Sequence, residues 1–246
     1  MIRNLKILLL AALAVTAFSA LSVSVAQATK FTAPGGTTTT VKAAKDGTGK
    51  TAHQVFDIYN AAKSSEVSFT CEEITGSGTI AGESTEEFAL VTPGFSGHCT
   101  VAGQETLTIT NLGCNLQLNA NGTAKIVSEA GHNCAHSLGS SHEAGKEPIT
   151  LQTGAFNCTI EIGAQTLAGK VKFHNLTNAL VTVKSGEGET ITVEFPTPTP
   201  TGFIDNAFGT GCPFGTQSNG QITTSNFILQ GFKPNGTQQV IRWDEI

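Results

Sequence analysis

Charged side chains are scarce in this sequence of 246 residues. Asp, Glu, Lys and Arg make up 13% of it, about half the usual fraction, which excludes a coiled coil and a charge-rich disordered chain. The 14 Lys and Arg residues are outnumbered by 19 Asp and Glu residues. The chain therefore lacks the basic excess that binds phosphates, and we expect no nucleic-acid partner.

Aromatic residues with a polar edge are almost absent, since Tyr59 and Trp243 are the only tyrosine and tryptophan. This scarcity argues against a sugar-binding cleft lined with stacking rings. The carboxylate pairs at residues 72–73 and 86–87 do not restore a glycosidase hypothesis, because adjacent strand residues point to opposite faces. The 14 phenylalanines are interpreted as core residues.

Motifs for nucleophilic or phosphate-transfer catalysis are also missing. His53 and Ser96 suggest a serine protease, but Ser96 lacks the preceding Asp of that motif and the only Asp between the two is Asp57. Three catalytic groups so placed do not match a triad. The glycines stand singly at turns, which excludes a phosphate-binding loop. We therefore predict that the protein is not an enzyme and needs no cofactor.

Residues 1–28 are predicted to be a secretory signal peptide. Arg3 and Lys6 precede an apolar stretch at residues 7–21, and Ala26-Gln27-Ala28 fits the cleavage pattern. The apolar stretch is short for a membrane anchor, and no lipidation cysteine or twin arginine accompanies it. We expect a mature chain with no transmembrane segment that is secreted, extracellular or at the cell surface, where its partner would be a cell-surface or extracellular ligand.

The cysteines predict three disulfides, because an even number in an exported chain indicates an oxidising compartment. No two of them form a CxxC pair, so a zinc ribbon or a redox motif is not supported. The sequence does not determine their pairing, although we favour Cys134 with Cys158, which flank a stretch able to fold back as a hairpin. The six are Cys71, Cys99, Cys114, Cys134, Cys158 and Cys212.

Apolar and polar residues alternate with period two along much of the chain, as at residues 107–110, 116–118 and 191–195. This period and the abundant threonine are typical of strands with one face in a core. The segment 52–62 is also interpreted as a strand. Asn-Gly pairs at Asn121, Asn219 and Asn235 predict tight hairpin turns. We predict an all-β fold, an antiparallel β-sandwich or barrel-like domain with three disulfides.

The Gly-, Thr- and Lys-rich residues 29–51 predict a flexible lead-in, with one candidate edge strand at residues 37–41. Residues 52–246 would then form one sandwich-like domain. An internal echo leaves an alternative open: Phe69-Thr70-Cys71 and Phe156-Asn157-Cys158 are each followed by a similar hairpin ending in glycine. In that alternative, two small sandwiches meet near residue 145.

A series of segments carries a resemblance to a known group. They are FTC, VTPGFSGHC, NLGCNLQL, CTIEIGAQTLAG and GCPFG, in that order between about residues 67 and 232. The sequence resembles a loose set of exported, cysteine-patterned, β-rich hypothetical proteins of actinobacteria. The resemblance implies an exported β-rich protein of bacterial origin and no particular activity.

The richest cluster of reactive side chains is residues 131–143, GHNCAHSLGSSHE. His132, His136 and His142 are spaced so that they could converge on zinc or copper. A disulfide at Cys134 would remove the thiolate from that set, and ordering a Gly- and Ser-rich loop would oppose binding. We therefore favour a non-catalytic binding or structural protein. The alternative is a secreted metal-binding protein or enzyme that uses the His132–His142 loop.

Overall fold

The computed structural model describes residues 29–35, 38–44, 54–59, 66–71, 73–96, 99–101, 105–153, 157–167, 171–176, 190–195, 202–212 and 218–245. The predicted signal peptide lies outside these residues and stays a prediction. The described residues form 20 strands and no helix, and every pairing between strands is antiparallel. The all-β prediction is therefore confirmed. Within this described part, no helix could span a membrane.

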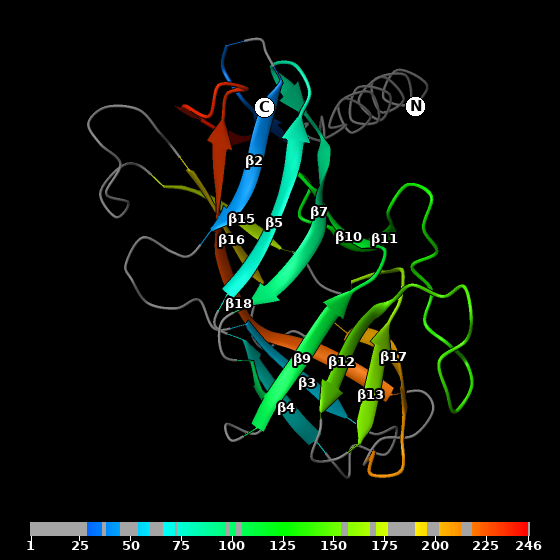
Figure 1. Cartoon of the computed structure of the whole chain (residues 1–246). Coiled ribbons are helices and arrows are strands. Elements are labelled where there is room, and N and C mark those ends of the chain that lie inside the picture. Colours follow the sequence, from blue (N-terminus) through cyan, green and yellow to red (C-terminus); the bar gives the residue numbers. More distant parts are fainter. Residues whose placement is uncertain are drawn as a thin grey trace, which may run out of the picture.

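One set of strands closes into a ring, called here the upper ring from its place in Figure 1. The ring closes because the N–H of Leu167 donates to Ala124 O at 3.0 Å and that of Val171 to Gly122 O at 2.7 Å, which extends the pairing of β14 along β11 toward β15. In ring order the strands are β2 (Thr39–Ala44), β5 (Glu73–Ile80), β7 (Glu87–Ser96), β10 (Cys114–Asn119), β11 (Ala124–Ser128), β14 (Gln165–Thr166) with β15 (Lys172–Leu176), β16 (Thr190–Phe195) and β18 (Ser218–Phe232).

The other set closes into a lower ring. Its strands are β3 (Gln54–Tyr59), β4 (Glu66–Cys71), β8 (Thr100–Val101), β9 (Glu105–Asn111), β12 (Ile149–Thr153), β13 (Cys158–Ile162), β17 (Gly202–Phe208) and again β18. Residues 218–224 of β18 pair in the lower ring and residues 225–232 in the upper ring. The 15-residue strand β18 therefore belongs to both rings, as Figure 1 shows.

The chain passes from one ring to the other after every one or two main strands. It runs from β2 to β3, returns from β4 to β5, and continues in this way until β18 crosses as a single strand. The strands of each ring therefore follow chain order. The crossing segments place long stretches of chain at the junction of the rings. The crossing from β11 to β12, residues 129–148, is the longest described one.

The interior of the rings is filled by the apolar side of the period-two pattern. Leu107 is 4% exposed, Ile191 and Val193 are fully buried, and Ile109 packs against the same core. Buried side chains of both rings belong to one continuous cluster. The predicted alternation is therefore confirmed, and the two rings share a single core.

A small three-stranded sheet of β1 (Thr29–Thr32), β6 (Ser84–Thr85) and β20 (Arg242–Glu245) packs on the upper ring. Its Phe31 ring meets the rings of Phe88 and Phe173 edge to face, with centroids 4.9 and 5.0 Å apart. Trp243 packs on Phe173 and donates its indole N–H to Ala120 O at 2.8 Å. The short β19 (Gln238–Gln239) pairs with the end of β18.

Two strands, β1 and β2, lie within residues 29–51, which we expect to be a flexible lead-in with a candidate edge strand at 37–41. Strand β2 overlaps that candidate, but it is paired on both sides, with β5 and β18. Phe31 and Val41 are fully buried, because the apolar residues at 31, 33, 41 and 43 alternate with polar ones and each strand finds a partner. The prediction of a hairpin turn at Asn219-Gly220 is wrong. Both residues lie inside β18, with β17 on one side and β3 on the other, so tertiary pairing overrides the local turn preference.

The prediction of three disulfides is confirmed, whereas the favoured pairing of Cys134 with Cys158 is wrong. The bonds are Cys71–Cys99, Cys114–Cys134 and Cys158–Cys212. The hairpin in this region is formed by β12 and β13, where Cys158 lies opposite Thr153. Cys134 instead lies near the far end of β13, because its carbonyl accepts the N–H of Ala164.

Candidate functional site

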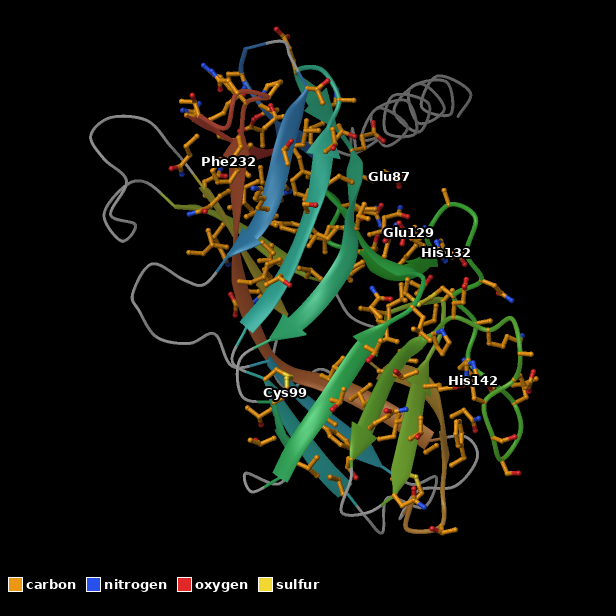
Figure 2. The ribbon with its side chains drawn as sticks, in the orientation of Figure 1. Glu87, Cys99, Glu129, His132, His142 and Phe232 are labelled. Carbon is orange, nitrogen blue, oxygen red and sulfur yellow. A yellow bond between two sulfur atoms is a disulfide. The ribbon has the colours of Figure 1, made fainter. Side chains whose placement is uncertain are left out.

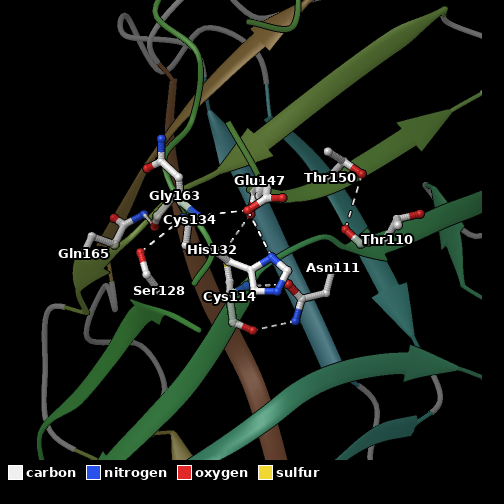
Figure 3. Close-up of a disulfide and its surroundings, with 11 residues drawn as sticks. Thr110, Asn111, Cys114, Ser128, His132, Cys134, Glu147, Thr150, Gly163 and Gln165 are labelled. Carbon is white, nitrogen blue, oxygen red and sulfur yellow. Dashed lines mark hydrogen bonds and ion pairs between the residues drawn. A yellow bond between two sulfur atoms is a disulfide. The ribbon is translucent and has the colours of Figure 1, made fainter. Parts of the chain in front are cut away.

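The crossing of residues 129–148, called here the covering loop, lies over the outer face of the lower ring. Its disulfide to Cys114 and the burial of Cys134 fix it at the junction of the rings. The N–H of Cys134 donates to Ser128 Oγ at 3.1 Å, and its carbonyl accepts the N–H of Ala164 at 2.5 Å. Figure 3 shows this anchorage, which gives the polar loop a defined path despite its Gly- and Ser-rich sequence.

A carboxylate clamps the two ends of the covering loop together. Glu147 Oε2 accepts the N–H of Asn133 at 2.9 Å and lies 3.0 Å from His132 Nδ1. The bond from the Asn133 backbone is the main cause that lowers the pKa of the Glu147 carboxyl below its ordinary value of 4.5, and His132 lowers it further, while partial burial opposes the shift. The clamp therefore favours the ionised carboxylate.

A second carboxylate, Glu161, is buried beneath the same loop. It lies in β13 between the buried Ile160 and Ile162, so its side chain points to the outer face of the ring. The face is covered there, and Glu161 is 0% exposed. Its Oε2 accepts the N–H of Ser137 at 2.7 Å, and its Oε1 lies 2.5 Å from His142 Nδ1. These partners offset the cost of burying a carboxylate.

An open cleft of about 360 Å³ lies beside this pair on the outer face of the lower ring. Its floor is made of two rows of residues that lie opposite one another on β9, β12, β13 and β17. The floor residues are Thr110, Thr150, Gln152, Thr159 and Glu161. The walls are Leu112, His142 and Phe208, of which Leu112 is 43% exposed. The cleft combines a polar floor with an apolar side, as small-molecule sites do.

The hydrogen bonds beneath the cleft leave acceptors on its surface. A carboxylate oxygen only accepts, so His142 Nδ1 carries the hydrogen of its bond to Glu161. Thr150 Oγ1 donates its hydrogen to Thr110 O at 3.3 Å and keeps its lone pairs. The cleft is therefore able to accept hydrogen bonds from a bound molecule.

The three histidines of the alternative metal-binding hypothesis do not come together. His132 is held by Glu147 and His142 by Glu161, while the backbone and Nδ1 of His136 lie against Gly163. Figure 2 shows His132 and His142 at separate places on the loop. Among the described residues, no three His, Cys, Asp or Glu side chains could hold a metal ion. Cys134 is oxidised and provides no thiolate.

The sequence did not identify Glu161 as a candidate functional residue. It occupies a polar position in an alternating strand, and such positions are normally solvated, so the pattern gave no sign that a loop covers it. The only local signal is its place three residues after Cys158. The apolar residues of the same strand are all buried in the structure. Its partner His142 was identified as a candidate metal ligand.

No protein family, curated protein or solved structure was found to match this chain.

Proposed function

We propose that this is an exported, non-catalytic binding protein that takes a small ligand in the cleft beside the covering loop. The observation that carries the proposal is Glu161, a fully buried carboxylate on the floor of an open cleft. A folded chain rarely buries such a group without a compensating role, because replacing buried ion pairs by apolar residues is often neutral or stabilising.

Export is supported by two features of the described fold. Three disulfides with no free cysteine among the described residues are typical of oxidising compartments. The second feature is that Thr29, the residue directly after the predicted cleavage site, pairs with Glu245 of β20 in the fold. We propose secretion or cell-surface association on this basis, in keeping with the resemblance to exported actinobacterial proteins. The test is N-terminal sequencing of the protein recovered outside the cell, which should begin at Thr29.

Binding is tested by filling the cleft. Thr110 is an exposed residue of its floor, and a Thr110→Trp variant should occupy the space without disturbing the core. A small-fragment library is screened against the wild-type protein by ligand-observed NMR. Fragments that bind should lose binding to Thr110→Trp and keep it with Thr79→Trp, which changes an exposed threonine of β5 in the upper ring. Fragments that bind all three proteins alike, or no hits at all, would contradict the proposal.

A further inference from the structure

We infer that the cleft selects a small cation, an ammonium group on an apolar body; this rests on the proposed function and specifies its ligand. The first reason is charge. Glu161 is the carboxylate of the cleft, and no described residue that lines it is Lys or Arg. An anionic ligand would meet the Glu161 carboxylate with no lysine or arginine of the cleft to bind it, whereas a cation is attracted to that carboxylate.

The second reason is the direction of the hydrogen bonds. The hydrogens of His142 Nδ1 and Thr150 Oγ1 are used within the protein, which removes two donors from the cleft and leaves the threonine oxygen as an acceptor. The Glu161 oxygens accept only. The Glu161 oxygens are already bonded to Ser137 and His142, so the free acceptor is the Thr150 oxygen, which matches an ammonium group with its three donors and no acceptor.

The third reason is an acceptor beside the cleft that lacks a donor. Asn206 lies opposite Glu161 in the register of β13 and β17 and is fully buried. Its Nδ2 donates to Gly139 O at 2.9 Å, but its Oδ1 has no partner. Hydrogen-bond donors are therefore lacking beneath the covering loop as well as in the cleft.

The fourth reason is the wall of the cleft. Leu112 and the half-buried Phe208 supply an apolar side next to the polar floor. An aromatic face attracts a cation placed over it, and the leucine covers an apolar body. The combination fits a primary amine that carries a ring or a short hydrocarbon.

The experiment compares three probes with the same body: 2-phenylethylammonium, 2-phenylethanol and phenylacetate. Binding constants are measured by protein-observed NMR from the shifts of the Thr110 and Thr150 signals. We expect the ammonium to bind at least about tenfold more tightly than phenylacetate, as a charge-assisted hydrogen bond provides, with the alcohol between them.

A Glu161→Gln variant should reduce the ratio of ammonium to alcohol affinity to about one, because the shape is kept and the charge is lost. The matched control is Glu194→Gln, which changes another histidine-paired glutamate, on β16 of the upper ring, and should leave the ratio unchanged. The Ser137 amide signal verifies that the covering loop stays closed in Glu161→Gln.

Two failures are distinguishable. If the probes bind with equal affinity, if phenylacetate binds most tightly, or if Glu161→Gln keeps the preference with its loop closed, the cation inference is overturned and the proposed function stands. If none of the three probes moves the cleft signals, the cation inference is overturned, and the proposed function is overturned with it only if the fragment screen also finds no binder of the cleft.

Discussion

At the scale of single residues, two carboxylates hold the covering loop, and they differ in exposure. Glu161 is fully buried and anchors the loop through Ser137 and His142, whereas the Glu147 side chain is 37% exposed and joins the loop's two ends. The first is expected to shape the cleft and the second to fix the loop around it.

The contribution of Glu147 should depend on pH. Its pKa is lowered in the folded protein, chiefly by the Asn133 N–H. The stabilisation is therefore complete above the unfolded pKa of the group and is lost as the pH falls through the folded pKa. We expect the melting temperature of Glu147→Gln to lie below that of the wild type at neutral pH and to converge with it in acid. A difference that grows on acidification would contradict this assignment.

Gly163 is required where the covering loop touches the lower ring. A Cβ at this position would lie 2.5 Å from His136 N and 2.8 Å from its Nδ1. A Gly163→Ala change should therefore displace the loop backbone and cost about 1–3 kcal/mol in the free energy of unfolding, measured by urea denaturation. The control is Gly139→Ala in the same loop, where the nearest atom to a Cβ is Glu143 Oε1 at 4.0 Å. Equal losses from the two changes would refute the steric explanation.

At the scale of elements, two of the disulfides fix different segments of the chain. Cys114–Cys134 ties the covering loop to the start of β10, whereas Cys71–Cys99 joins β4 to the segment before β8. Their sequence separations are 20 and 28, and loop closure of this length stabilises a fold by roughly 3–4 kcal/mol.

Replacing Cys114 and Cys134 by alanine should therefore abolish the cleft as well as lower stability. We expect the fragments that bind the wild type to lose at least about tenfold in affinity, while far-UV circular dichroism keeps its β-sheet form. The matched double variant of Cys71 and Cys99 should lose similar stability and retain binding, since that disulfide does not tether the covering loop. Retained binding in the Cys114 and Cys134 variant would show that the loop forms without its tether.

At two of the three Asn-Gly pairs, the local sequence pattern was sufficient to predict a turn. The Asn121-Gly122 and Asn235-Gly236 turns were predicted, and Gly122 and Gly236 have φ of 85° and 80°. Asn219-Gly220 carries the same signal but lies within β18. A turn preference is a local energy of modest size, and two flanking strands outweigh it.

At the scale of the whole molecule, the two rings are joined by strand β18 and by a common core. Phe227 lies in the upper half of β18, is fully buried, and belongs to the same cluster as Leu151 and Ile160 of the lower ring. Because β18 belongs to both rings, opening one ring would remove strand pairing from the other. We therefore expect the rings to unfold together.

Phe227→Ala tests this cooperativity. The loss of a buried aromatic ring should cost about 3–5 kcal/mol. Trp243 fluorescence follows the upper ring, and the methyl NMR signals of Leu151 and Ile160 follow the lower ring during urea denaturation. All three signals should shift to the same lower midpoint. A lower-ring midpoint that stays at the wild-type value would show that the rings are independent.

The sequence by itself determined the all-β character of the described chain and the oxidation of its cysteines. These follow from local properties: the period-two alternation at residues such as Leu107 and Ile109, and an even cysteine count behind a predicted export signal. The tertiary structure alone decided that Cys134 bonds to Cys114, that β18 serves two rings, and that Glu161 is covered. Alternation tells which side of a strand is apolar, but it carries no information on which distant segment lies over the polar side. That choice depends on contacts between residues far apart in the chain, here the 129–148 crossing placed over β13.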